Sequence, residues 1–208
     1  MKIDPNEKFI MKNWEATLSL VEKTFQVPNH PLLDLLETLG ERYMMAPASP
    51  KKDFHSSFPG GLAYHNLHVI TWLVKFATLL APKKYDMKTL VTVGILHDIG
   101  KVGTLEADYY VPTTEFWQRE RGIFYTTSRK IQYMKIPHRS LYLAQHFYGE
   151  LNGMSLSEEE YLAIMLHDGM YEEANRSYSF KEPELAYILH QADYWASRLE
   201  KDNEIIGW

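Results

Sequence analysis

The most informative stretch of this 208-residue chain for its fold and function is Leu96-His97-Asp98-Ile99-Gly100-Lys101. It lies at the end of an apolar segment. A histidine followed directly by an aspartate offers an imidazole nitrogen and a carboxylate oxygen, and both atoms suit divalent first-row metal ions. The glycine that follows lets the chain turn away from the pair without a side-chain clash. The stretch therefore predicts the end of a buried helix that carries two metal-binding side chains.

Further candidate ligands occur on both sides of this stretch. His65 precedes it, and His138, His167 and Asp193 follow at wide intervals, each in or beside a segment with helical apolar spacing. A single such histidine is more often a packed core residue than a ligand. Ligands from several helices can converge in the core of a helical bundle, where apolar packing holds them rigidly. The combined pattern therefore favours one metal site.

The composition is that of a single globular domain. Hydrophobic residues make up 45% and charged residues 24% of the chain, as is usual for such domains. The chain has no cysteine, which excludes disulfides and thiolate metal sites and leaves histidine and carboxylate ligands. No apolar run reaches the roughly 18 residues of a membrane span, and the first residues lack the apolar core of a secretory signal. We expect a cytoplasmic protein without a membrane partner.

Apolar periodicity, prolines and capping residues predict helices along most of the chain. They are expected over residues 9–25, 31–45 and 62–80, then from a cap at Asp86 to the His97–Asp98 pair, and again from residues 137, 157 and 183. Residues 46–61 hold three prolines and two glycines and predict a loop. Ser157 and Glu160 fit a capping box at the start of one helix.

Residues 103–136 have a different pattern, rich in β-branched and aromatic residues. They predict an insertion with one β-hairpin, for which Arg121-Gly122 is a plausible turn. The predicted fold is therefore all-α, a helical bundle with a small aromatic-rich β-hairpin insertion. We expect a single domain over residues 1–208, with N-terminal helices and a loop to about residue 59, a metal-binding core over 60–200 and the insertion over 103–136.

The order H…HD…H…H…D resembles the HD-domain superfamily of metal-dependent phosphohydrolases, specifically its two-metal branch, roughly from Gly60 to Glu200. The resemblance implies two divalent transition-metal ions, of manganese, iron or nickel. It assigns one bridging carboxylate, Asp98, to both ions. It implies that the first ion is bound by His65, His97, Asp98 and Asp193, and that the second is completed by His138 and His167.

Two basic side chains near the ligands are candidates to act with Asp98 in catalysis. Lys101 follows the pair and could hold a substrate phosphate as a point charge, although a solvated lysine is an equally good explanation. Arg139 and Ser140 follow His138 at a helix start, where free amides and a guanidinium favour an anion. The sequence His138-Arg139-Ser140 is also similar to a motif in HD proteins, so we expect Arg139 and Ser140 to contact substrate.

The aromatic insertion has two interpretations. Tyr110, Trp117 and Tyr125 could cover the metal site and stack on a nucleobase. Buried aromatic residues that support a hairpin are the commoner explanation.

The remaining histidines receive lesser roles. His68 lies one turn after His65 on nearly the same helix face and His190 lies three positions before Asp193, so each is expected to support its neighbouring ligand. The other three are expected to be structural or exposed: His30, His55 and His146.

The resemblance implies hydrolysis of a phosphate ester or phosphodiester by a metal-bridging hydroxide. The formal net charge of −5 gives no overall field for long nucleic acid, which favours a nucleotide, a cyclic dinucleotide or a short single-stranded oligonucleotide with a 3′ end. Some HD-domain proteins with a similar ligand set are instead mixed-valent diiron oxygenases acting on small polyols or phosphonates. A non-catalytic binding module is the third alternative.

Overall fold

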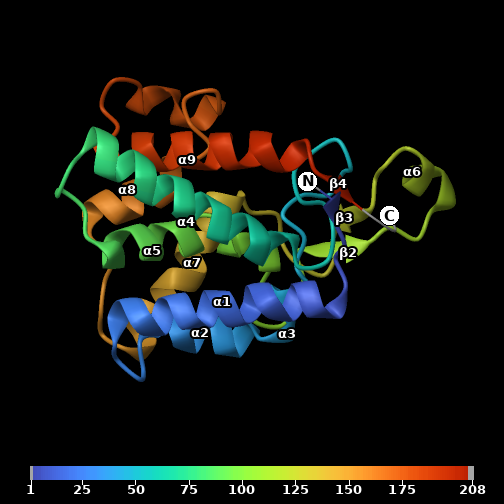
Figure 1. The fold of residues 1–208 in the computed structure, drawn as a ribbon, viewed down its shortest axis with the longest axis horizontal. Helices are drawn as coiled ribbons and strands as arrows, with labels where there is room; N and C mark the ends of the chain where they lie inside the picture. Colours follow the sequence, from blue (N-terminus) through green and yellow to red (C-terminus); the bar gives the residue numbers. More distant parts are fainter. Residues whose placement is uncertain (1, 206–208) are drawn as a thin grey trace.

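The computed structural model describes residues 2–205 and is largely helical, with one small antiparallel sheet in the predicted insertion (Figure 1). This arrangement confirms the all-α prediction with a β-hairpin insertion. In the described part of the chain, no helix combines the length and apolar character needed to cross a membrane.

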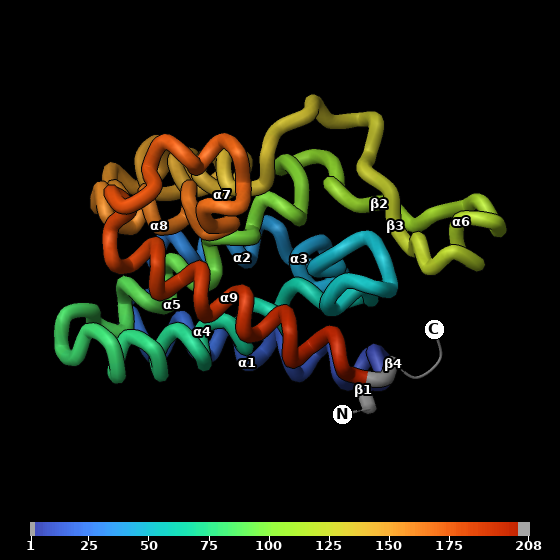
Figure 2. The backbone as a smooth tube through the Cα atoms, turned by 90° about the horizontal axis from the view of Figure 1, so that it is seen from above, coloured from blue at the N-terminus to red at the C-terminus, as the bar shows by residue number. Residues whose placement is uncertain are grey.

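Two long helices form the centre of the molecule. α4 (Gly61–Leu80) and α9 (Glu184–Lys201) pack along one another (Figure 2). α5 (Met87–Leu96) packs against α4, and α8 (Glu158–Leu166) packs against both α5 and α9. One continuous core of buried apolar side chains runs through these four helices. They bring the end of α5 beside the second turn of α4 and beside the middle of α9.

The N-terminal helices cover the opposite side of α4 and α5. α1 (Glu7–Phe25) contacts both of them, and α2 (Pro31–Leu39) and α3 (Glu41–Met45) pack against α1. The prediction of one helix over residues 31–45 is wrong. Gly40 has a φ of 47° and separates two helices, because this left-handed backbone, which glycine adopts without strain, cannot continue a right-handed helix.

Residues 99–135 leave the bundle and return to it. η1, a 3₁₀ turn (Ile99–Val102), directly follows the His97–Asp98 pair. β2 (Tyr110–Pro112) then pairs antiparallel with β3 (Tyr125–Thr127). A short helix, α6 (Phe116–Glu120), lies between the strands at the outer end of the molecule (Figure 1). Arg121-Gly122 therefore ends α6 and is not the hairpin turn that the sequence predicted.

The hairpin is attached to the loop before α4. The Lys52 amide donates to the Gly122 carbonyl at 2.8 Å, and the Phe124 amide donates to the Pro50 carbonyl at 3.0 Å. The predicted loop over residues 46–61 is present up to the start of α4. It lies between the hairpin and the bundle.

The remaining elements complete the layer around α5. α7 (Ile136–Gln145) continues into the π-helical turn η2 (His146–Leu151), and the 3₁₀ segment η3 (Glu173–Tyr178) joins α8 to α9. β1 (Lys2–Ile3) and β4 (Glu204–Ile205) form a short parallel pair. The predicted capping residues Asp86 and Ser157 both accept a hydrogen bond from a free helix amide, and Ser157 forms the predicted capping box.

Candidate metal centre

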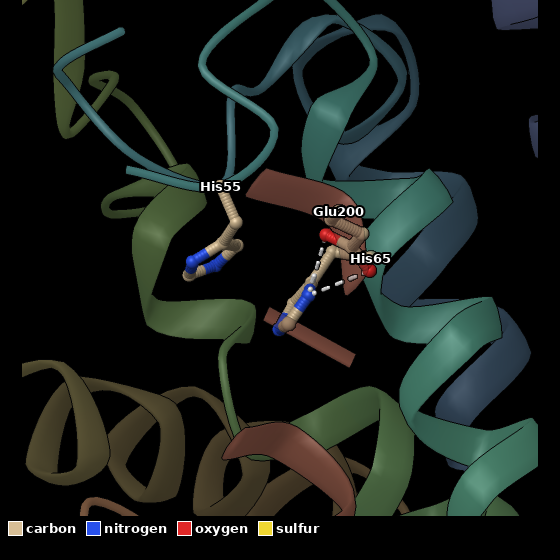
Figure 3. Close-up of side chains that lie close together, drawn as sticks. All are labelled: His55, His65 and Glu200. Atoms are coloured by element: carbon tan, nitrogen blue, oxygen red, sulfur yellow. Dashed lines mark hydrogen bonds and ion pairs between the residues drawn. The ribbon is translucent and has the colours of Figure 1, made fainter. Parts of the chain in front are cut away.

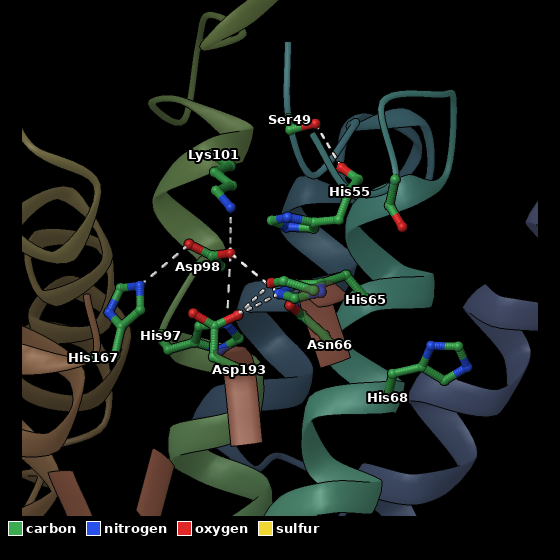
Figure 4. A network of polar contacts seen from close by, with 12 residues as sticks. Ser49, His55, His65, Asn66, His68, His97, Asp98, Lys101, His167 and Asp193 are labelled. Carbon is green, nitrogen blue, oxygen red and sulfur yellow. Dashed lines mark hydrogen bonds and ion pairs between the residues drawn. The ribbon is translucent and has the colours of Figure 1, made fainter. Parts of the chain in front are cut away.

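Four helices bring five of the six predicted metal ligands together (Figure 4). His65 lies in the second turn of α4, and Asp193 lies on α9, which packs against it. The α5 and α8 helices each end at a histidine followed by an aspartate, and these two ends point at the same place. The ligands that meet there are His65, His97, Asp98, His167 and Asp193.

Asp98 lies at the middle of this cluster and has imidazoles on both of its oxygens. Its Oδ2 is 3.7 Å from His65 Nε2 and 3.5 Å from His97 Nε2. Its Oδ1 is 3.5 Å from His167 Nε2. On the Oδ2 side, Asp193 Oδ1 lies 3.1 Å from His65 Nε2. A larger group of donor atoms therefore lies at Asp98 Oδ2 and a smaller one at Oδ1, and His97, His167 and Asp193 also lie close enough together to share an ion.

Each of the three imidazoles is oriented by a hydrogen bond at its Nδ1 atom. His97 Nδ1 donates to the Gly94 carbonyl at 2.9 Å, and His167 Nδ1 donates to the Ile164 carbonyl at 2.8 Å. Because a carbonyl can only accept, these contacts place a proton on Nδ1 and direct Nε2 toward the carboxylates. Metal-binding histidines are usually held in this way. Burial disfavours a charge on His167, but Asp168 and Asp98 outweigh burial and raise its pKa to about 9. Its Nε2 atom must therefore release a proton before it can bind an ion.

The Nε2 atoms of His65 and His97 are buried and lack a hydrogen-bond partner among the described residues. A buried polar atom without a partner is costly. A metal ion would use both lone pairs together with Asp98 Oδ2, and these three donors lie close enough to share one ion. The orphaned nitrogens and the chemistry of the donor set thus fit a divalent transition metal.

The carboxylates make the centre attractive to a cation. Burial disfavours a charge on His65, but Glu200 and Asp193 outweigh this effect and raise its pKa to about 10. Burial also disfavours the charge on Asp98, yet its pKa is held well below the usual range, mainly by Lys101. Burial lowers the pKa of His97 to about 4, so this imidazole is neutral, as a metal ligand must be.

Glu200 is a functional residue that the sequence reasoning missed. It lies two turns after Asp193 on α9, and its buried carboxylate accepts from His65 Nδ1 at 3.1 Å (Figure 3). The same carboxylate accepts from His68 Nδ1 at 3.1 Å. It also accepts from the Ser56 hydroxyl at 2.7 Å. Glu200 lies seven positions after Asp193, which places both carboxylates on one helix face. This spacing is the feature of the sequence that could have pointed to Glu200.

Lys101 lies where the sequence predicted a charge beside the metal pair. Its Nζ donates to Asp98 Oδ2 at 2.5 Å, and its side chain is only 13% exposed. Burial opposes the ammonium charge, but Asp98 outweighs burial and raises the pKa of Lys101. The ammonium thus neutralises the central carboxylate from the side that faces the insertion.

Ser140 and Arg139 have different partners from those expected. Ser140 is fully buried, its Oγ donates to the His97 carbonyl at 2.9 Å, and it accepts from the Gly100 amide at 2.9 Å. Arg139 is also buried and donates to the Gln132 carbonyl at 2.7 Å. The Ser140 hydroxyl fastens the turn after α5 to α7, and its contact with a substrate stays a prediction. Arg139 braces the segment before α7.

Ser140→Ala is expected to destabilise the protein without removing a metal ligand. The variant leaves the buried Gly100 amide without a partner, which costs about 1–3 kcal/mol. Chemical denaturation should show a lower free energy of unfolding by this amount. Ser155→Ala, at an exposed position, is the matched control and should unfold like the parent protein. Equal stability of the two variants would contradict the assignment.

The structure does not bring His138 into the cluster. α7 buries Pro137, Arg139 and Ser140 and leaves His138 exposed, because the buried face of α7 packs against η1. The smaller group of donors therefore consists of Asp98 Oδ1 and His167 Nε2. Asp168 Oδ1 lies 3.7 Å from the same His167 nitrogen.

The predicted stacking residues are separated from one another. Tyr110 and Tyr125 line a cavity of about 320 Å³ that Lys101 also lines. Trp117 is half-exposed on α6, at the outer end of the insertion, and packs against Arg121. Trp117 therefore does not cover the metal cluster, because α6 carries it away from the bundle (Figure 1).

Two of the lesser histidines support the cluster. His68 contacts Glu200, as its helical spacing from His65 suggested. The prediction for His190 is wrong, since its Nδ1 donates to the His167 carbonyl at 2.8 Å and it supports that residue rather than Asp193. His55, expected to be structural or exposed, instead lies against the ring of His65.

A cavity of about 280 Å³ gives access to the cluster. It is lined by the ligands Asp98, His167 and Asp193 and by two lysines, Lys101 and Lys135. Neither a protein-family model nor a curated protein nor a solved structure matches this chain. The geometry of the cluster and the residues that open onto it are therefore the basis for assigning a function.

Proposed function

We propose that this protein is an HD-domain phosphohydrolase that requires divalent transition metal and cleaves a phosphate ester or phosphodiester of a nucleotide-like substrate. The observation that carries the proposal is the position of Asp98, which has two imidazoles near one of its oxygens and a third imidazole near the other. A carboxylate that offers one oxygen to each group is suited to bridge two ions. The choice of the HD-domain family rests on the order of the histidines and aspartates in the sequence.

The first ion would be held by the larger group of donors: His65, His97, Asp98 and Asp193. The second would be held by Asp98 Oδ1 and His167, and it would bind more weakly because His138 is exposed. When bound, such ions supply an activated water and neutralise charge on a phosphoryl oxygen. Manganese, iron and nickel all suit these nitrogen and oxygen donors.

The residues around the cluster would bind and orient the substrate. Lys101 and Lys135 line the access cavity, where they pair with Asp98 and Glu172. Each ammonium has further donors and can also attract a phosphate group. An adjacent cavity of about 480 Å³, also lined by Lys101, adds Arg198 and Lys201. The lining of this adjacent cavity, in which three basic side chains face one carboxylate, Asp53, supports an anionic substrate despite the negative net charge of the chain.

The test is a panel of nucleotides, cyclic dinucleotides and short oligonucleotides with 3′ ends, each with manganese, iron or nickel. Phosphate and nucleoside release should depend on the metal and should be lost in an Asp98 variant purified in parallel. Absence of release from every substrate would contradict hydrolysis. Substrate-dependent oxygen uptake by the iron-loaded protein, with a mixed-valent diiron signal, would replace hydrolysis by the oxygenase alternative.

Tyr110→Ala is expected to weaken substrate binding with little effect on turnover. Tyr110 lines the cavities of about 320 Å³ and about 480 Å³, which Lys101 also lines. Its ring can stack on a base there. Such a contact contributes about 1–3 kcal/mol, so KM should rise by roughly ten-fold or more while kcat stays nearly constant. Trp117→Ala is the matched control and should leave both constants unchanged. A larger effect at Trp117 than at Tyr110 would contradict this site.

A further inference from the structure

His55 has the same unusual property as two of the predicted metal ligands. Its Nε2 atom is buried and has no hydrogen-bond partner among the described residues, as for His65 and His97. Its ring lies 4.4 Å from that of His65, measured between centroids, with an angle of 34° between the planes. Figure 4 places His55 beside His65, on the same side of Asp98 as Lys101. The shared property points to a shared role.

The loop that carries His55 is fastened on both sides of this residue. The Ser49 hydroxyl donates to the His55 carbonyl at 2.5 Å, and the Ala48 amide donates to the Ser56 carbonyl at 3.1 Å. The Ser56 hydroxyl is bound to the Glu200 carboxylate. Gly61 permits this close packing, since a Cβ there would lie 2.0 Å from the Ser56 carbonyl oxygen. The imidazole is therefore presented by a braced segment of backbone.

The hydrogen bonds of Glu200 indicate on which side of His65 an ion would lie. His55, His65 and Glu200 lie close enough to share one ion (Figure 3). However, the Glu200 carboxylate is already bound by His65 Nδ1, His68 Nδ1 and the Ser56 hydroxyl. The nitrogen of His65 that remains for an ion, once its proton is released, is Nε2, which faces Asp98 and Asp193. His55 lines the same cavity as these two aspartates.

We propose that His55 is an additional metal ligand, which joins His65, His97, Asp98 and Asp193 around the first ion. The ligand class is a divalent first-row transition metal, which imidazole and carboxylate donors suit. The inference rests on the metal centre of the proposed function but not on hydrolysis. It gives the loop before α4 a direct part in metal binding.

The test measures metal binding without substrate. His55→Ala and His55→Gln are titrated with Co²⁺ and Mn²⁺ against the parent protein and against His146→Ala, whose imidazole pairs with Glu150 on the surface turn η2. Loss of residues that only orient ligands lowers metal affinity by roughly 10–100-fold. Loss of the ligand itself should lower Co²⁺ affinity at least ten-fold and alter the visible Co²⁺ spectrum. Added imidazole should restore the spectrum in His55→Ala.

Two results would overturn the proposal. The first is parent-like Co²⁺ affinity and spectrum in a folded His55 variant. The second is a variant that binds metal normally but loses affinity for inorganic phosphate, which would make His55 a substrate contact. His55→Gln retains most of the side-chain volume and provides the test if His55→Ala does not fold. Because no substrate is present, these results stand apart from any failure to detect hydrolysis.

Discussion

Asp98→Ala is expected to abolish metal binding. His97 faces one oxygen of this carboxylate and His167 faces the other. Removal of Asp98 would therefore take a ligand from each of the two proposed ions. Elemental analysis after dialysis should find transition metal in the parent protein and only background in the variant. Hydrolysis of any substrate found by the panel should also fall to background. A variant with full metal content would show that Asp98 is not a bridging ligand.

The same substitution has a second effect that must be separated from the first. Without Asp98, the Lys101 ammonium is largely buried without its partner, and breaking a buried ion pair in this way costs about 3–5 kcal/mol. The double variant Asp98→Ala with Lys101→Met removes the stranded charge and keeps the volume. It should recover stability in a denaturation experiment without recovering metal. Recovery of metal would contradict the ligand assignment.

His138→Ala is the matched control among the predicted ligands. Its position is exposed, so the metal content of this variant should equal that of the parent protein. Loss of the weaker ion alone would show that His138 reaches the second site when metal is bound, as the sequence pattern predicted.

Glu200→Ala should weaken metal binding strongly although Glu200 does not face the ion. Its carboxylate holds His65 in the orientation that presents Nε2, and it fastens the loop at Ser56. Removal of such an orienting partner lowers metal affinity by roughly 10–100-fold. Titration with Mn²⁺ should show this loss, and thermal unfolding should show a lower Tm because three donors lose their acceptor.

Two further variants make the Glu200 result specific. Glu200→Gln retains one acceptor oxygen and should lose less affinity than Glu200→Ala. Glu184→Ala, at the other end of α9, breaks only a half-exposed ion pair with Lys84 and should leave metal affinity unchanged. An equal loss in Glu184→Ala would indicate a general disturbance of α9 instead.

Local patterns predicted most of the helices because each depends on nearby residues. Apolar periodicity found the segments, and Asp86 and Ser157 set the starts of two of them as capping theory requires. The prediction failed where one residue changed the backbone direction, at Gly40, and where a short helix replaced a turn, at α6. Neither event changes the apolar pattern enough to be seen in the sequence.

The site was predicted where ligands follow a motif and missed where they depend on tertiary contact. Five of the six predicted ligands lie close together, and whether they bind an ion stays a prediction. The contact between Glu200 and Ser56 spans 144 positions, so no local signal announces it. The burial of Ser140 was not predicted, because the motif that contains it does not say which face of α7 is buried.

The packing of α9 against α4 has a consequence for the order of folding. Asp193 and Glu200 both reach His65 only through this contact, which closes a loop of 135 positions between His65 and Glu200. Contacts so distant in the chain form late and slow the folding of a domain. A complete set of donors thus exists only after α9 has docked, and an ion bound there would stabilise only the finished molecule. At 100 times its dissociation constant, an ion bound only by the folded state adds about 2.7 kcal/mol of stability. Because such an ion binds only after folding is complete, it would slow unfolding and leave the folding rate unchanged.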